Sequence, residues 1–259
     1  MWLDLPVVES ELRTSFAGRR LIYLTSTPST QDIARAEAEA GAPEGTAVVA
    51  EEQTAGRGRF GRQWLSPAGK NIYLTLLLRP TVDQLRRLGI ITPLAVCLAI
   101  EETTGLVPRI KWPNDVLLSG RKTCGALIDA EFSGADPRYA LVGVGVNVNF
   151  EIDPDSEIAA IATSIKQELG ADTSREGILA ALLNHLEALY TAPDPRAVHE
   201  AWKSRLETLG RDVTLTFHGE TCSGYADDVD AAGNLILRLP DGSHRTFEAG
   251  EVSLRAPEA

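Results

Sequence analysis

Three arginines and three glycines alternate in the stretch AGRGRFGRQW, residues 55–64. The residues are Arg57, Arg59, Arg62, Gly56, Gly58 and Gly61. A guanidinium group is a planar fork that binds two phosphate oxygens at once and stays charged at physiological pH. Glycine lets the backbone wrap around an anion and expose its N–H groups. The stretch therefore predicts a loop that holds a polyphosphate, with a solvated basic surface as the alternative.

The glycine spacing also matches the G-x-G-x-x-G pattern of dinucleotide-binding turns. That motif needs a helix that begins inside it, whereas Pro67 and Gly69 follow here and the next pattern is a strand. Arginines at the intervening positions would also crowd a dinucleotide that approaches the backbone. A Walker A loop is excluded because the sequence contains no G-x-x-x-x-G-K-[ST].

A second basic cluster surrounds the sequence KWPND, residues 111–115. Lys122 lies close behind it and could neutralise the charge that develops when a carboxylate attacks phosphorus. A plain surface lysine is the alternative. Asn114 and Asp115 could hold Mg²⁺ or make an orienting hydrogen bond, and an ordinary turn explains them equally well.

The segment LVGVGVNVN, residues 141–149, alternates with a period of two. One face carries Val142, Val144, Val146 and Val148, and the other carries Gly143, Gly145, Asn147 and Asn149. The valine face is expected in the core. The glycine face is nearly free of side chains, which suits a ligand lying flat on the backbone or, equally, a closely crossing helix.

Alternating strand and helix patterns surround these motifs. Strand patterns cover 19–27, 46–53, 71–80, 108–118, 121–132 and 139–150, and helix patterns cover 29–45, 92–105, 173–190 and 194–210. Thr92 and Pro93 have the types expected at a helix start, and Thr173 with Glu176 has the spacing of a capping box.

From residue 211 the pattern changes to short alternating runs. Turn signals at 218–219, 232–233 and 241–242 separate these runs, and they predict a small β-barrel of about 50 residues. We therefore expect two domains, residues 1–208 and residues 209–259.

The composition is that of a globular protein, with 259 residues, 44% hydrophobic and 24% charged. Cys97, Cys124 and Cys222 are too scattered for a disulfide framework or a zinc site. The net charge of -11 opposes binding to nucleic acid or anionic lipid. Without a signal peptide or a long apolar run, the chain is expected to be cytoplasmic, with neither nucleic acid nor membrane as a partner.

Six segments taken together resemble the bacterial biotin protein ligases. They are STQD, EEQTAGRGRFGRQWLSP, KWPNDV, RKTCGALI, GVGVNVN and GEVSLR, and they run in order from about Thr25 to Arg255. The resemblance implies an α+β fold of the class II synthetase and biotin ligase type. In that fold a central mixed β-sheet is flanked by helices and followed by a small SH3-like β-barrel. Few residues precede the first motif, as in the form of the family that lacks an N-terminal DNA-binding domain.

The resemblance also implies a two-step reaction. Biotin and MgATP give biotinyl-5′-AMP and pyrophosphate, and a lysine of a biotin carboxyl carrier protein then attacks the activated carbonyl. The acceptor would be a subunit of acetyl-CoA carboxylase or of a related carboxylase. ATP and Mg²⁺ are the implied cofactors, biotin is the substrate, and the expected state is a monomer or a weak homodimer.

Site residues follow from the same resemblance. The catalytic residues would be Lys122, Arg57 and Arg59. The biotin site would comprise Ser29, Thr30, Gln31, Gln53, Gly56, Arg57, Gly58, Arg59, Trp64, Lys122, Gly125, Ala126, Leu127, Gly143 and Gly145. ATP would contact Arg57, Arg59, Arg62, Lys111, Asn114 and Asn147, and Asp115 would bind Mg²⁺. Many relatives carry Asn in place of Gln31, and the segment 150–165 contains no tryptophan of the kind that family members stack on adenine.

Three other functions are alternatives for this sequence. A lipoate or octanoate ligase would also activate an apolar carboxylate, and lipoate-dependent adenylate formation would identify it. A biotin-sensing module would hold an adenylate without passing it on. A Ser-His hydrolase is disfavoured because the sequence lacks G-x-S-x-G and its histidines fall on expected helix surfaces or barrel loops.

Overall fold

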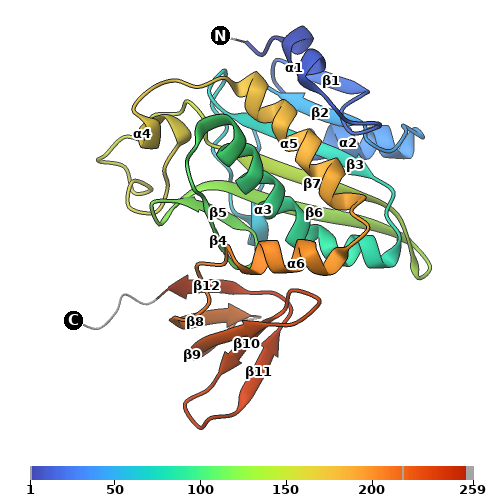
Figure 1. Cartoon of the computed structure of the whole chain (residues 1–259). Coiled ribbons are helices and arrows are strands. Elements are labelled where there is room, and N and C mark those ends of the chain that lie inside the picture. The colour runs from blue at the N-terminus through green and yellow to red at the C-terminus, as the bar shows by residue number, and fades with distance from the viewer. Residues whose placement is uncertain (1, 218, 255–259) are drawn as a thin grey trace.

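The computed structural model describes residues 2–217 and 219–254 (Figure 1). His218 in the first expected barrel turn and Arg255 at the end of GEVSLR lie outside these residues. The described chain forms two β-sheets with helices packed against the larger one (Figure 1). None of its helices has the length and apolar character needed to cross a bilayer.

The larger sheet has seven strands in a mixed arrangement. In spatial order they are β1 (Leu21–Leu24), β2 (Ala47–Ala50), β3 (Ile72–Leu78), β7 (Asp136–Val146), β6 (Arg121–Ser133), β5 (Asp115–Leu118) and β4 (Arg109–Lys111). The β1–β2 pair is parallel and the other neighbours are antiparallel. Ser119 and Gly120 connect β5 to β6 with φ angles of 49° and 75°, so the strand patterns expected at 108–118 and 121–132 meet in a tight hairpin.

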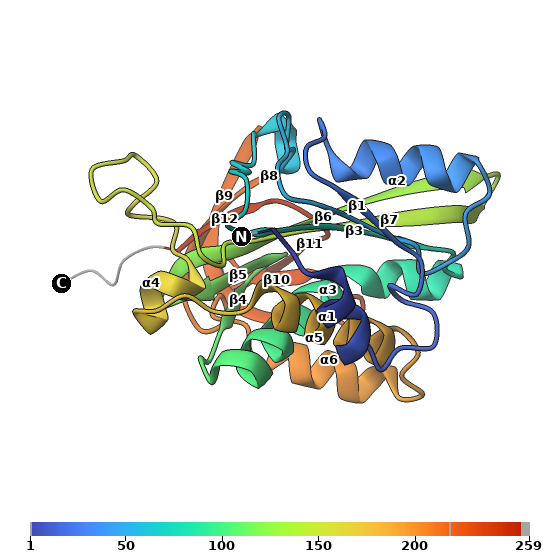
Figure 2. The same cartoon turned by 90° about the horizontal axis from the view of Figure 1, so that it is seen from above.

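Helices cover both faces of this sheet. They are α1 (Leu5–Glu11), α2 (Thr30–Glu39), α3 (Val82–Thr104), α4 (Ile165–Leu169), α5 (Arg175–Tyr190) and α6 (Pro195–Lys203). Figure 2 shows α2 on one face and α1, α3, α5 and α6 on the other. The larger apolar core lies on the α3–α5 side and takes in Val142, Val144 and Val146, as the alternation predicted. The expected mixed sheet flanked by helices is confirmed.

Two helix starts differ from those expected. α3 begins at residue 82, where Thr81 and Gln84 form a capping box, so Pro93 lies inside the helix and Thr92 is not its N-cap. The helix continues through Pro93 because the packing of the buried apolar residues between 88 and 100 outweighs the one hydrogen bond that the proline removes. The N-cap of α5 is Ser174, whose hydroxyl accepts a bond from the Gly177 N–H, rather than Thr173.

The smaller sheet follows at the C-terminal end. Its strands are antiparallel in the order β11 (His244–Phe247), β10 (Leu235–Arg238), β9 (Glu220–Val229), β8 (Asp212–Phe217) and β12 (Glu251–Leu254). It lies against the α6 and β4 end of the larger sheet (Figure 1). Trp112 Nε1 donates to the Gly233 carbonyl at 2.9 Å, and the Lys203–Asp228 ion pair spans 2.7 Å. These contacts fix the barrel against the rest of the chain.

Candidate functional site

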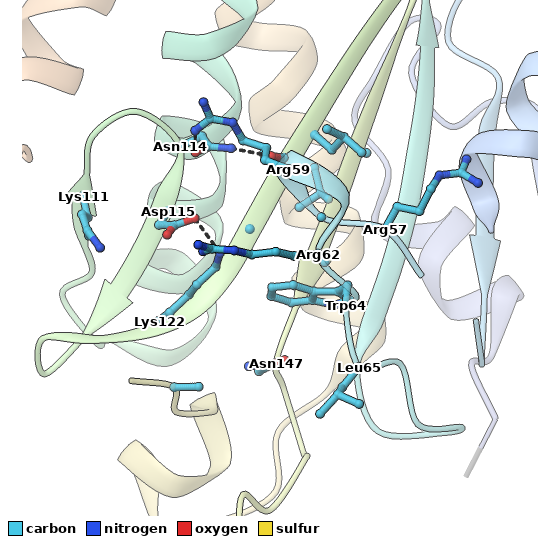
Figure 3. Close-up of a pocket in the computed structure, with 18 of the residues that line it drawn as sticks. Arg57, Arg59, Arg62, Trp64, Leu65, Lys111, Asn114, Asp115, Lys122 and Asn147 are labelled. Carbon is cyan, nitrogen blue, oxygen red and sulfur yellow. Dashed lines mark hydrogen bonds and ion pairs between the residues drawn. The ribbon is translucent and has the colours of Figure 1, made fainter. Parts of the chain in front are cut away.

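A cavity of about 660 Å³ lies between the arginine-glycine loop (residues 55–65), the larger sheet and the start of β12 (Figure 3). Among the residues that the structure describes, every predicted site residue except Gly56 lines it. A Cβ at Gly56 would lie 2.6 Å from the Trp64 carbonyl oxygen and 2.8 Å from Ser66 Oγ. Gly56 therefore serves the close packing at the base of the loop.

The arginine-glycine loop is a short hairpin. The Gly58 N–H donates to the Arg62 carbonyl at 2.7 Å, and the Trp64 N–H donates to the Gly56 carbonyl at 2.9 Å. At the tip, Phe60 and Gly61 have φ angles of 57° and 72°, the left-handed region that glycine tolerates best. The expected loop is therefore ordered by its own backbone bonds, and the exposed Phe60 is at its tip.

The three arginines of the loop point to different partners. Arg57 forms two bonds with the Asp32 carboxylate on α2, at 2.9 Å and 2.6 Å. Arg59 Nη1 donates to Asn114 Oδ1 at 3.0 Å and Nη2 to the carbonyl of Gly250 at 3.4 Å. Figure 3 shows Arg57 directed away from the other labelled cations. The sequence did not predict this divergence.

Arg62 completes the set, with its Nη2 2.6 Å from Glu251 Oε2 on β12. Arg59 and Arg62 thus tie the loop to the barrel. The hydrogen bonds with Asp32 raise the pKa of Arg57, whereas burial lowers the pKa of Arg59 against the charges of Asp115 and Glu251. Of the three arginines in this loop, Arg59 therefore has the least favourable environment for its charged form. An anionic ligand beside Arg59 would stabilise that charge.

Lys122 reaches the middle of the cavity from β6. Its Nζ lies 2.7 Å from Asp115 Oδ1 and 5.3 Å from the centre of a Trp64 ring. The Lys122 N–H donates to the Ile161 carbonyl at 2.9 Å, and the Lys122 carbonyl accepts from the Thr163 N–H at 2.9 Å. Strand pairing and these backbone bonds therefore bring the KWPND segment and Lys122 together, as the sequence predicted for the second basic cluster.

The glycine face of β7 is covered by the protein's own side chains. A Cβ at Gly145 would lie 2.5 Å from Trp64 Nε1, and one at Gly143 would lie 2.6 Å from Gln31 Nε2. A Cβ at Gly125, opposite Gly145 in the sheet, would likewise lie 3.1 Å from the Trp64 ring. In this structure, side chains rather than a flat ligand take up the space that these glycines leave, while the glycines still border the cavity.

Polar side chains from α2 and from the segment that follows β2 close the end of the cavity beside Gly143. Gln53 Oε1 accepts from the Thr30 N–H at 2.9 Å, and Gln53 Nε2 donates to Ser66 Oγ at 3.1 Å. Gln31 Nε2 donates to the Leu127 carbonyl at 3.0 Å. Within the described chain, Gln31 Oε1 and Trp64 Nε1 are buried without a hydrogen-bond partner. A buried acceptor and a buried donor without partners are costly unless a ligand satisfies them.

Apart from Arg57, the predicted ATP contacts are spread around the opposite end. Asn147 Nδ2 donates to the Thr163 carbonyl at 3.1 Å, and Asn114 Nδ2 donates to the Ala126 carbonyl, so both amides already hold the backbone. Lys111 extends from β4 on the side away from Arg57 (Figure 3). Sequence reasoning missed the apolar lining here, which includes Phe150, Ile158 and Ile161. Apolar residues inside an otherwise polar segment were the available signal.

A protein-only metal centre is absent from the described residues, which contain no group of three or more His, Cys, Asp or Glu able to hold an ion. Asp115 and Glu251 are the two carboxylates among the described lining residues. Asp115 already pairs with Lys122. These residues could bind Mg²⁺ only if the phosphates of a nucleotide supplied most of its ligands and one carboxylate supplied another.

Two family models match the chain. The Biotin/lipoate A/B protein ligase family matches residues 23–147, and the Biotin protein ligase C terminal domain matches residues 208–255. The Bifunctional ligase/repressor BirA of Bacillus spizizenii is 35% identical over 252 residues, which are 93% of this chain and 77% of the relative. The Biotin--[acetyl-CoA-carboxylase] ligase of Mycobacterium tuberculosis is 33% identical over 95% of both chains.

A solved structure is similar over both sheets. The biotin protein ligase from Aquifex aeolicus in complex with biotin and ATP has a TM-score of 0.76 and 31% identity to this chain. The match covers 92% of this chain and 99% of the other. Sequence identity of this size over nearly the whole length agrees with the shared fold. The chain therefore belongs to the biotin protein ligase family of enzymes.

Proposed function

We propose that this enzyme uses ATP to activate biotin as biotinyl-5′-AMP and then transfers the biotinyl group to a lysine of a biotin carboxyl carrier domain. The observation that carries the proposal is the convergence of Lys122 and Arg59 on one cavity that also holds the unpartnered Gln31 Oε1 and Trp64 Nε1. A similar ligase, from Aquifex aeolicus, has been solved with both biotin and ATP bound.

In the first step a biotin carboxylate oxygen attacks the α-phosphorus of ATP. The new P–O bond forms as the bond to pyrophosphate breaks, so negative charge builds on the bridging and leaving oxygens. Lys122 and Arg59 supply fixed positive charge at this place, which favours the transition state over the separated reactants. Lys122 exchanges its bond to Asp115 for one to the incoming anion, and the adjacent Trp64 ring helps to keep the ammonium in place.

In the second step the neutral amine of the acceptor lysine attacks the activated carbonyl carbon. The C–N bond forms, the C–O bond to AMP breaks, and the nitrogen releases one proton to water. Lys122 and Arg59 remain beside the departing phosphate and stabilise the AMP anion. The same charges thus serve both steps.

Biotin's ureido ring has N–H donors and a carbonyl acceptor. Gln31 Oε1 can accept from a ring N–H, and Trp64 Nε1 can donate to an acceptor. Ala126 and Leu127 on β6 contribute apolar wall beside them. The biotin ring therefore lies at the Gln31 end of the cavity with its carboxylate directed toward Lys122.

ATP takes the remaining volume. Arg59 and Arg62 face its phosphates, and the purine packs on Phe150, Ile158 and Ile161 in place of the absent tryptophan. Mg²⁺, held by the nucleotide's phosphates and Asp115, would screen the charge of the triphosphate. Residues 1–208 form the catalytic domain in this proposal, and residues 209–259 form the barrel that closes one wall.

Pyrophosphate exchange into ATP tests the first step with biotin, lipoate and octanoate in parallel. We expect exchange with biotin, whereas exchange with lipoate or octanoate alone would assign the chain to the related ligases. The second step is tested by mass spectrometry of a carrier domain, with its acceptor Lys→Arg variant as the control. Adenylate formation without transfer to the intact carrier would identify a biotin-sensing module instead.

A further inference from the structure

Arg57 differs from the other cations around the cavity in the direction of its side chain. Its two terminal nitrogens each donate to a different carboxylate oxygen of Asp32, which is on the first turn of α2. The guanidinium points away from Lys122 and Arg62 (Figure 3). Arg59 and Arg62 instead cross to the KWPND segment and the barrel. The predicted phosphate ligand Arg57 is thus turned toward a helix.

The bidentate pair leaves little of the Arg57 fork for another anion. A fork that faces two carboxylate oxygens has its two most accessible donors engaged. A phosphate would have to displace Asp32, and the charge of Asp129 also favours the charged form of Arg57. Arg57 therefore has the environment of a group held in place by protein carboxylates.

The position of Arg57 in the hairpin gives this pair its effect. Arg57 forms an isolated antiparallel bridge with Gln63, at the base of the loop, and Arg59 and Arg62 lie between these two positions. A base fixed to α2 sets where the hairpin starts and hence where the Arg59 fork lies relative to Asn114. Without a fixed base, the binding of substrate would have to order the hairpin at a cost in affinity.

We propose that Asp32 and Arg57 are positioning residues, a loop anchor that holds the arginine-glycine loop on α2 while Arg59 contacts the substrate. The inference rests on the proposed function only for its kinetic readout. The alternative is that Asp32 stores Arg57, which then swings into the cavity to bind phosphate. The two mechanisms make opposite predictions for the removal of the Asp32 charge.

Asp32→Asn decides between them. If the pair is an anchor, this variant loosens the loop as Arg57→Gln does. Both variants then raise the KM for biotin and ATP about threefold to fivefold, with kcat within about twofold, as expected for an exposed ion pair. If Arg57 is a stored phosphate ligand, Asp32→Asn frees it, so KM stays at or below that of wild type while Arg57→Gln loses activity.

A second readout needs no substrate. Phe60 at the loop tip is 66% exposed, so its cleavage by chymotrypsin reports how often the loop opens. We expect Asp32→Asn and Arg57→Gln to be cut about threefold to fivefold faster than wild type. Because this assay measures the loop alone, it distinguishes failure of the anchor from failure of the ligase assignment, which would show as no exchange by the wild type.

A charge swap and a matched control complete the experiment. The double variant Asp32→Arg with Arg57→Asp keeps an ion pair at the anchor but removes the cation that a phosphate ligand needs. If its KM values and its resistance to chymotrypsin return most of the way to those of the wild type, the anchor is supported. Arg138→Gln breaks the Arg138–Glu39 pair, which also ends on α2, has similar exposure and is 3.2 Å long, and it should change neither readout. The proposal would be overturned if Asp32→Asn had the KM values and cleavage rate of the wild type. It would also be overturned if the charge-swapped variant were impaired as strongly as Arg57→Gln.

Discussion

The ammonium of Lys122 lies 2.7 Å from the carboxylate of Asp115, so the central cation of the cavity rests on a counter-charge supplied by the adjacent strand. The pairing of β5 with β6 places Asp115 opposite Gly125, and the missing side chain at that glycine makes room for both Lys122 and the Trp64 ring. The cation is thus held in position before any substrate arrives, and its removal is the most direct test of the mechanism.

Lys122→Ala should lower kcat/KM for biotin-dependent pyrophosphate exchange by about 100-fold or more, because it removes a preorganised charge from the transition state. The measurement is exchange of labelled pyrophosphate into ATP over a range of biotin concentrations. Lys70→Ala is the control, since Lys70 follows the arginine-glycine loop in sequence but does not line the described cavity. Equal rates for wild type and Lys122→Ala would remove this lysine from the mechanism.

Gly145→Ala should weaken biotin binding, because the added methyl group would lie 2.5 Å from Trp64 Nε1 and push the indole into the cavity. Calorimetric titration gives the change in Kd. The matched control is Gly89→Ala in α3, where a Cβ meets open space. That variant should bind biotin normally and be more stable by roughly 0.5–1 kcal/mol. Unchanged affinity in Gly145→Ala would mean that Trp64 does not border the biotin site.

We expect the free energy of unfolding to fall as the pH drops through the lowered pKa of Glu168. Burial raises the pKa of this carboxyl, but hydrogen bonds from Ser119, Thr163 and Arg121 outweigh it and hold the pKa below the ordinary 4.5. A lowered pKa in the folded state gives stabilisation that is complete above the unfolded value and is lost as pH falls through the folded value.

Urea unfolding at a series of pH values below 6 should therefore show this loss in the wild type and a smaller one in Glu168→Gln. The glutamine variant should already be destabilised by about 1–3 kcal/mol at neutral pH, because its amide cannot accept from three donors. Glu151→Gln, which alters an exposed ion pair with Lys166, is the control. Parallel pH profiles for wild type and Glu168→Gln would contradict the assignment.

Glu251→Gln should raise the KM for ATP about twofold to fivefold, since it weakens the bond that ties Arg62 to the barrel, an exposed pair 2.6 Å long. Steady-state kinetics at saturating biotin measures this change. Glu220→Gln removes another barrel carboxylate, 3.7 Å from Arg245, and should leave KM unchanged. An unaltered KM in Glu251→Gln would show that this contact does not position the loop.

Much of the fold could be predicted because its signals are local. The Ser29 N-cap, the hairpin at Ser119–Gly120 and the valine alternation in β7 each depend on neighbours in sequence, and each is found in the structure. α3 shows the limit of such signals. Pro93 indicates a helix start by local rules, but burial on the sheet carries the helix through it from residue 82.

The membership of the cavity could be predicted from motifs, but the direction of its side chains could not. Alternating arginines in a loop suggested one convergent cluster, whereas Arg57, Arg59 and Arg62 each pair with a partner that is 25 to 191 residues distant. Such pairings depend on tertiary contacts that no local pattern encodes. For the same reason, the glycines of β7 indicated empty space without showing that Gln31 and Trp64 take it up.

Residues 250–253 of the barrel line the cavity, and the hydrogen bond from Trp112 to Gly233 holds the barrel against the larger sheet. A chimaera that receives its barrel from another ligase would thus acquire foreign residues in one wall of this cavity, and under the proposed function its affinity for ATP would change with the transplanted strand. For protein engineering, the residues around the cavity and the C-terminal strands therefore have to be exchanged together.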